Sequence, residues 1–204
     1  MLGAAREFIE AILIGIVVFF VLQISVQNFK VEGSSMDPTL EDGEYLLVNK
    51  LEYLRVDTER LSNLIPFWNV KEKKTLFLFH PPRGGDVVVF RYPLDPGRDF
   101  VKRIEAVPGQ TVEIRHGTVY VDGVPLEEAY AARGIRDEYM APQQMGPDEY
   151  FVVGDNRPHS SDSRDWGPVP LENIVGKVWV TYWPLDRLGF LGGKVPLESL
   201  PGTP

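Results

Sequence analysis

Residues 85–93 read Gly-Asp-Val-Val-Val-Phe-Arg-Tyr-Pro, a short run rich in β-branched and aromatic residues that does not alternate between apolar and polar positions. Such a run is typical of a strand that is covered on both faces, because neither face then requires polar side chains. We therefore predict that this stretch forms a central strand of a sheet.

A second strand is predicted over Asp99–Val107, after a turn through Pro96-Gly97. Because side chains alternate along a strand, its residues divide into two faces. One face holds Phe100, Lys102, Ile104 and Ala106, and the other holds Val101, Arg103, Glu105 and Val107. An ammonium group at Lys102 is therefore costly unless it is neutral, partnered or able to reach solvent at a sheet edge. Arg103 can pair with Glu105 two positions along the strand and needs no special explanation.

Further strand-like runs show β-branched and aromatic residues between turn residues. They cover residues 43–51, 111–114, 118–121, 124–126, 150–153 and 174–183, and Asp122-Gly123 makes the turn of a small hairpin. In the last run Trp179, Thr181 and Trp183 are predicted to share one face. The fold class that follows is mainly β, either a coiled antiparallel sheet or a partly closed barrel.

Two segments do not fit this sheet. Residues 52–83 form an excursion whose apolar cluster either rests at a membrane surface or forms a satellite hydrophobic cluster. The cluster consists of Leu64, Ile65, Phe67 and Trp68. A cap-like insertion is predicted over about residues 110–148, because its second half, 127–148, is rich in charges, Gly and Pro.

The N-terminal segment is almost wholly apolar. From Phe8 to Val26 it is interrupted only near its ends, and at about 1.5 Å per helical residue it nearly matches a bilayer core of roughly 30 Å. The alternatives are a cleavable signal peptide and a buried core helix, but no small-x-small cleavage site follows and the run lacks a polar face. We predict a transmembrane α-helix that anchors the protein through residues 1–27 and precedes a folded domain over 28–204. The charges before the run give only a weak indication of its orientation.

The composition excludes several classes of function. The 204 residues carry a net charge of -8, whereas sequence-independent binding of nucleic acid requires a basic face. The chain has no cysteine, which rules out thiolate chemistry, and its three histidines are scattered without metal-ligand spacing. We therefore expect no nucleic-acid partner, no metal and no cofactor, and any catalysis must use hydroxyl, amine or carboxylate groups.

Residues 33–40 read Gly-Ser-Ser-Met-Asp-Pro-Thr-Leu, and this octet suits a tight, extended turn that presents a hydroxyl. We assign the nucleophile to Ser35; the alternative is that the small residues form a flexible joint. A serine needs a base, and the amine of Lys102 is the main candidate because no histidine stands in an evident triad pattern. Lowering the pKa of a lysine from about 10.4 to roughly 8 requires about 3 kcal/mol, which burial on an apolar face supplies.

Four motifs follow the apolar segment. They are Ser-Met-Asp-Pro-Thr-Leu at 35–40, Gly-Asp-Val-Val-Val-Phe at 85–90, Val-Lys-Arg-Ile at 101–104 with Pro108-Gly109, and Gly-Asp-Asn-Arg at 154–157 with Ser-Ser-Asp-Ser-Arg at 160–164. In these motifs and in their order the chain resembles bacterial type I signal peptidases, the membrane-anchored Ser/Lys proteases that remove signal peptides from exported proteins.

The resemblance implies a role for each matched residue. Ser35 would be the nucleophile of a serine endopeptidase, and Lys102 would be its general base. The hydroxyl of Ser160 would orient the Lys102 amine. Asp162 and Arg164 would form an ion pair that braces the site.

Two further positions concern the walls of the site. By resemblance, Met36 would help to wall it. Where some members of the family carry a serine that completes the oxyanion hole, this sequence has Gly33. The hole would then depend on the Ser35 backbone N–H and on a second donor that the sequence does not identify.

The resemblance also implies a location and partners. It indicates a single-pass protein of the bacterial cytoplasmic membrane with a peptidase domain over 28–204 on the extracytoplasmic side. Its partners would be signal peptides of exported preproteins and membrane lipid. A self-cleaving repressor of the related Ser/Lys class is a rival, but the chain lacks a DNA-binding helical domain. A membrane-tethered module that binds extended peptides without cutting them is the other alternative.

Overall fold

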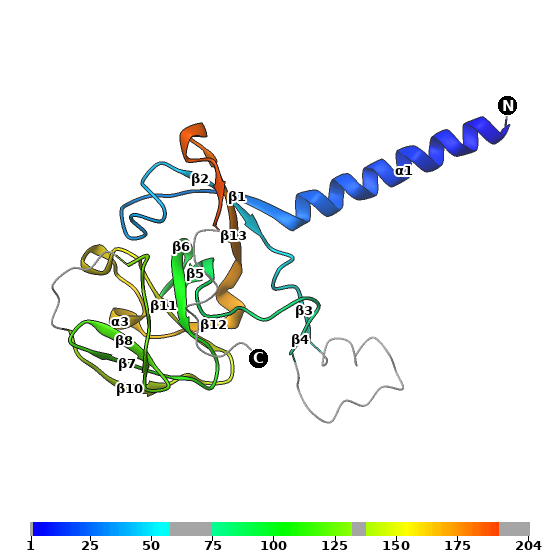
Figure 1. The fold of residues 1–204 in the computed structure, drawn as a ribbon. Coiled ribbons are helices and arrows are strands. Elements are labelled where there is room, and N and C mark those ends of the chain that lie inside the picture. Colours follow the sequence, from blue (N-terminus) through cyan, green and yellow to red (C-terminus); the bar gives the residue numbers. More distant parts are fainter. Residues whose placement is uncertain (1, 58–74, 132–137, 192–204) are drawn as a thin grey trace, which may run out of the picture.

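The computed structural model describes residues 2–57, 75–131 and 138–191, and within them one long helix, α1 (Leu2–Ser25), extends away from a body of β-sheets (Figure 1). The first strands are β1 (Val26–Lys30), β2 (Tyr45–Asn49), β3 (Arg55–Asp57), β4 (Thr75–Phe77), β5 (Val87–Tyr92), β6 (Asp95–Ala106) and β7 (Thr111–Arg115). The remaining strands are β8 (Thr118–Val121), β9 (Val124–Pro125), β10 (Met140–Gln144), β11 (Glu149–Val153), β12 (Val169–Pro170), β13 (Ile174–Trp183) and β14 (Gly189–Phe190). The short helices are η1 (Arg157–His159), α3 (Ser163–Trp166), η2 (Leu171–Asn173) and η3 (Leu185–Arg187).

The main sheet has the strand order β1-β2-β13-β5-β6-β11-β12, with β14 paired to β13. Its strand pairs are antiparallel, as are those of a second sheet, β10-β7-β8-β9, so the predicted mainly-β class is confirmed. β5 lies between β13 and β6, and Val87 through Phe90 are all buried. The prediction of a central strand covered on both faces is therefore correct.

The sheet is open, so the partly closed barrel was the wrong alternative. In the described part of the chain, β1 and β12 stand at opposite ends of the strand order and do not pair. β11 pairs with β6 only from Arg103 to Ala106, and β12 ends that side after two residues. Among the described residues β12 pairs only with β11, so the strand order ends there.

The hairpin β5–β6 differs in detail from the expectation. Tyr92 pairs with Asp95, so the tight loop is Pro93-Leu94 and not Pro96-Gly97. The register shift between Arg91 and Tyr92 places residues 96–98 in an irregular part of β6. In β13, Thr181 is buried whereas both tryptophans of the expected shared face are half-exposed, because register shifts interrupt the alternation of that strand.

The excursion and the cap are partly described. β3 and β4 pair to form a small ribbon at the base of the excursion, whereas the predicted cluster of Leu64 to Trp68 lies outside the described residues. The cap region contains the sheet formed by β7, β8, β9 and β10, which has a hydrophobic core against β11. Residues 132–137 of the cap also lie outside the described part.

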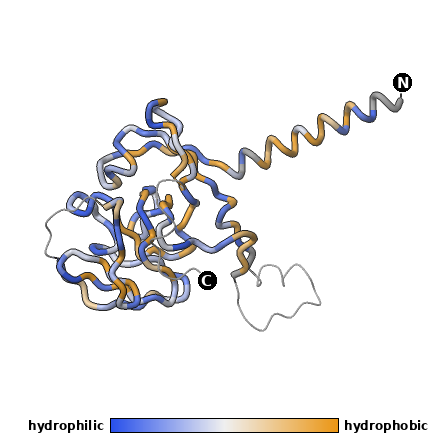
Figure 2. Tube along the Cα trace, in the orientation of Figure 1, coloured by the Kyte–Doolittle hydropathy of each residue, from blue (hydrophilic) through white to orange (hydrophobic). Residues whose placement is uncertain are grey.

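The helix α1 covers most of the segment for which we expected a membrane anchor, and Figure 2 shows that it is largely hydrophobic. It ends at Ser25, where the chain continues directly into β1. Among the described residues, however, no helix combines the length and the apolar character needed to cross a membrane. The structure therefore does not bear out the predicted transmembrane helix.

Candidate active site

The Ser35 turn joins β1 to β2 and is held by the loop that follows β11. The Asn156 backbone N–H donates to the Ser35 carbonyl at 3.0 Å, and the Asn156 side-chain amide donates to the Ser34 carbonyl at 2.9 Å. Gly33 has a φ of 88°, which favours glycine, and its N–H donates to Asp42 Oδ1. Because both sides of the turn are tied to other residues, Ser35 is held in a defined position and is not part of a flexible joint.

Gly154 explains how closely the loop approaches the turn. A Cβ atom added at Gly154 would lie 2.5 Å from the Ser35 carbonyl oxygen and 2.6 Å from Ser160 Cβ. Such distances are far below van der Waals contact, so only glycine permits this packing. The glycine thus brings the two motifs together.

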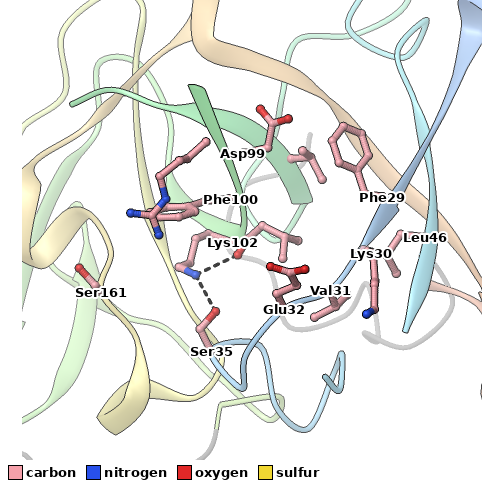
Figure 3. Close-up of a pocket in the computed structure, with 13 residues that line it drawn as sticks. Phe29, Lys30, Val31, Glu32, Ser35, Leu46, Asp99, Phe100, Lys102 and Ser161 are labelled. Carbon is pink, nitrogen blue, oxygen red and sulfur yellow. Dashed lines mark hydrogen bonds between the residues drawn. The ribbon is translucent and has the colours of Figure 1, made fainter. Parts of the chain in front are cut away.

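Lys102 lies on β6 and faces Ser35 (Figure 3). Its Nζ donates to Ser35 Oγ at 2.6 Å and to the Val101 carbonyl at 3.0 Å. The residue is 4% exposed, so the alternative in which it reaches solvent does not hold. Burial lowers the pKa of Lys102 to about 8, although the carboxylates of Asp162 and Asp155 act in the opposite direction. About one tenth of the amine is therefore neutral at pH 7, against less than about a thousandth for an exposed lysine.

Arg103, the next residue of β6, does not pair with Glu105 as we expected. Its Nε and Nη2 donate to the two carboxylate oxygens of Asp155 at 2.9 and 2.6 Å, and both side chains are buried. Glu105 instead accepts a hydrogen bond from Arg157 at 2.9 Å. The loop after β11 brings both partners onto this face of β6.

Ser160, Asp162 and Arg164 form one connected group in the same loop. Arg164 Nε and Nη2 donate to Asp162 at 2.7 and 2.9 Å, and Ser160 Oγ donates to Asp162 Oδ2 at 2.6 Å. Burial by itself raises the pKa of Asp162, but the hydrogen bonds from Arg164 outweigh it and hold the pKa below its usual range. The Ser160 hydroxyl is thus directed to Asp162, and no hydrogen bond joins it to Lys102 in the described structure.

Met36 does not lie where the resemblance placed it. It is 0% exposed and packs in the core under the turn, together with Val31 and Leu40. The turn directs successive side chains to opposite sides, so Ser35 faces the pocket while Met36 faces the core. Met36 therefore supports the turn from below and is absent from the residues that line the pocket.

The pocket beside Ser35 and Lys102 has a volume of about 430 Å³. Figure 3 shows Phe29 and Val31 on one side of it and Phe100 and Lys102 on the other. The lining residues are Phe29, Lys30, Val31, Glu32, Ser35, Leu46, Val89, Arg98, Asp99, Phe100, Val101, Lys102 and Ser161. Within the described residues no group of three or more His, Asp or Glu side chains could hold a metal ion.

Sequence analysis identified Gly154, Asp155, Asn156 and Arg157 as part of a motif but assigned none of them a role in this site. Their signal was present, because the loop 154–167 is denser in hydrogen-bonding side chains than an ordinary connection. What the density could not show was the partner of each side chain. Asp155 and Arg157 pair with residues of β6 about fifty positions earlier.

A buried lysine amine in contact with a serine hydroxyl, on an antiparallel β scaffold, defines the Ser/Lys class of serine hydrolases. Residues 5–183 match the family described as "Signal peptidase, peptidase S26", and the chain belongs to this family. It is therefore a serine endopeptidase of the signal peptidase type.

Several proteins are similar to this chain. The chain is 36% identical to the "Probable signal peptidase I-1" of Synechocystis sp., over 97% of this chain and 93% of that protein. It is 35% identical to "Signal peptidase I" of Leptolyngbya laminosa, over 84% and 78% of the two chains. A crystal structure of a signal peptidase I from Enterococcus faecalis is 30% identical, with a TM-score of 0.43 over 48% of this chain and 97% of that chain.

Proposed function

We propose that Ser35 is the nucleophile and Lys102 the general base of an endopeptidase that removes N-terminal signal peptides from exported preproteins. The observation that carries this proposal is the 2.6 Å contact between Lys102 Nζ and Ser35 Oγ, made by an amine whose burial lowers its pKa to about 8. A serine hydroxyl becomes an effective nucleophile when an adjacent base removes its proton.

The reaction proceeds in two halves. The neutral amine of Lys102 accepts the Ser35 hydroxyl proton as Oγ attacks the carbonyl carbon of the scissile peptide bond. The resulting ammonium gives that proton to the leaving amine of the mature protein, and the signal peptide remains as an ester on Ser35. Lys102 then takes a proton from the water that attacks the ester. That proton returns to Ser35 Oγ as the signal peptide leaves with a free carboxylate.

The substrate would bind as an added strand. In the described structure, β1 pairs only with β2, and residues 95–102 of β6 pair only with β5, so each strand has a free edge beside the pocket. A peptide laid along these edges places alternate side chains against the apolar floor formed by Val31 and Leu46. We expect the substrate residues placed there to be small, in line with the Ala-x-Ala preference of the family.

The domain 28–204 would work on the extracytoplasmic side of the bacterial cytoplasmic membrane, with α1 in contact with lipid. Large apolar side chains of α1 are exposed, such as Phe8 at 67% and Ile14 at 64%, and they support this contact. We expect deletion of residues 1–27 to preserve cleavage in detergent but to reduce co-sedimentation with phospholipid vesicles, because α1 supplies local concentration and not chemistry. Loss of cleavage by the truncated protein at high substrate would contradict this.

Incubation with an exported preprotein in detergent, followed by mass spectrometry of the products, tests the proposed function. The wild-type chain should release one N-terminal fragment that ends after a small residue. Ser35→Ala should lose at least about 10³-fold in kcat, because the nucleophile is removed. A protein that binds the preprotein and protects it from cutting would instead be a peptide-binding module.

A further inference from the structure

The cap contacts the loop that builds the active site through two ion pairs. Glu128 Oε1 lies 2.5 Å from Arg157 Nη2, and Glu138 Oε2 lies 2.9 Å from Arg164 Nη1. The Arg157 and Arg164 side chains are only 10% and 5% exposed, whereas their partners Glu128 and Glu138 are 12% and 26% exposed. Breaking either pair leaves the arginine with one carboxylate in place of two, Glu105 for Arg157 and Asp162 for Arg164.

The first pair leads to Ser35. Arg157 Nε donates to the Gly154 carbonyl at 3.0 Å, and two residues further along the same loop the Asn156 N–H donates to the Ser35 carbonyl. The guanidinium that Glu128 contacts therefore fixes the stretch of backbone that holds the nucleophile. Without Glu128, Arg157 would lose one of the two carboxylates that orient it.

The cap also reaches the back of the strand that carries Lys102. The Tyr130 hydroxyl donates to Glu105 at 3.1 Å, and the Arg103 guanidinium lies 3.9 Å from the centre of the Tyr130 ring. Burial raises the pKa of Glu105 to about 8, even though the neighbouring Arg157 and Arg103 act to lower it. Cap residues thus complete the surroundings of β6 on the face opposite to Lys102.

The second pair leads to Lys102. Arg164 contacts both Glu138 and Asp162, and its Nη2 also donates to the Arg157 carbonyl at 2.9 Å. Arg164 and Asp162 act on the Lys102 amine in opposite directions, since Arg164 lowers its pKa and Asp162 raises it. The charge of Glu138 is therefore one contact away from the groups that surround the amine.

We propose that Glu128 and Glu138 are positioning residues for the Ser35–Lys102 pair and act through Arg157 and Arg164. The cap is then part of the support of the active site and not only a cover of the second sheet. This inference rests on the proposed function of Ser35 and Lys102. It gives the cap a role in catalysis without contact between the cap carboxylates and the substrate.

The test compares Glu128→Gln and Glu138→Gln in the full chain with Glu127→Gln, a matched control at an exposed position next to Glu128. Cleavage of a signal-peptide substrate is measured together with thermal unfolding. We expect kcat to fall at least about 10-fold in each of the two variants with KM nearly unchanged, because misplaced catalytic groups slow the chemical step. Glu127→Gln should keep the wild-type kcat.

The pH dependence provides a readout that a purely structural role would not move. Glu138→Gln removes a negative charge beside Arg164, so the positive charge of Arg164 acts on the Lys102 amine with less compensation. The apparent pKa in the kcat/KM profile should therefore lie below that of the wild type. The corresponding shift in Glu128→Gln should be smaller, because Arg157 is not among the groups that shift the pKa of Lys102.

The milder Glu128→Asp and Glu138→Asp, which keep the charge, are measured alongside in case a Gln variant fails to fold. Values of kcat between those of the wild type and the Gln variants support the proposal. If the Gln and Asp variants fold and share the kcat and pH profile of Glu127→Gln, the positioning role of Glu128 and Glu138 is overturned, while the proposed function stands. A wild-type chain that does not cleave the substrate would overturn the proposed function, and this inference with it.

Discussion

The two faces of β6 carry buried cations in different surroundings. On one face the Lys102 amine, in a residue that is 4% exposed, has a serine hydroxyl and a carbonyl as its partners. On the other face Arg103, which is 2% exposed, binds both oxygens of Asp155. Burial lowers the pKa of Lys102 to about 8, whereas the pair with Asp155 outweighs burial and keeps Arg103 charged. The difference between the two residues is thus a direct contact with a carboxylate. Arg103 has one and serves as a structural cation, whereas the Lys102 amine has none among the described residues and can act as a base.

The largest effect is expected from removing the carboxylate of Asp155, which pairs with Arg103. Asp155→Asn leaves Arg103 buried and charged without its partner, which costs about 3–5 kcal/mol in the free energy of unfolding. Denaturant unfolding measures this change. The matched control is Glu41→Gln, because Glu41 is 55% exposed in its pair with Arg187 and should cost less than about 1 kcal/mol. Equal costs for the two variants would contradict the distinction between the faces.

The face of β6 that carries Lys102 is tested by Lys102→Arg. Arginine keeps the positive charge but cannot accept a proton near neutral pH. We expect a loss of at least about 100-fold in kcat with the fold preserved, the usual scale of general-base catalysis. The opposite exchange, Arg103→Lys, should cost far less in kcat and should instead weaken the fold, because a lysine cannot bind Asp155 with two parallel hydrogen bonds. A folded Lys102→Arg protein with near wild-type turnover would rule out the Ser35–Lys102 pair as the catalytic dyad.

The contact between the Ser35 turn and the loop that follows β11 is tested by Gly154→Ala. The added methyl group would meet the Ser35 carbonyl oxygen at 2.5 Å, so either the loop or the Ser35 turn must move. We expect a destabilisation of about 1–3 kcal/mol, the usual cost of overpacking, together with a lower kcat. Gly123→Ala serves as a control for glycine replacement, because a methyl group there has no atom within 4 Å, although its positive φ also carries a cost. Full activity of Gly154→Ala would show that the close approach is not needed.

The last prediction needs no substitution and concerns the pH dependence of the wild-type enzyme. The active form is the neutral amine, so the rate should rise about tenfold per pH unit below a pKa of about 8 and level off above it. The sign follows from burial, which disfavours the ammonium and lowers the pKa. A steady-state profile between pH 5 and pH 10 measures it, within the range in which thermal unfolding shows a folded protein. A rate that keeps rising to the pKa of an exposed lysine, about 10.4, would show that the amine is not buried in solution.

Local patterns were sufficient for most of the sheet. The strand over 85–93 and its central place followed from a run of apolar residues, and the hairpin through Asp122-Gly123 followed from its turn residues. Both features depend on neighbours within a few positions, which the sequence displays directly. The placement of Pro96-Gly97 failed because the register between β5 and β6 decides which residues form the loop.

The amino-acid sequence by itself determined the antiparallel β class, the two faces of β6 and the pairing of a serine turn with a lysine on an apolar face. These follow from alternation and composition, which are properties of short stretches. Only the tertiary structure decided that Arg103 binds Asp155, that Ser160 binds Asp162 and that Met36 lies in the core. The choice of such partners depends on how loops distant in sequence fold back on the sheet. A buried charge is stabilised by whichever opposite group lies within hydrogen-bond distance. The spacing of residues along one strand therefore could not reveal that the partner of Arg103 is Asp155.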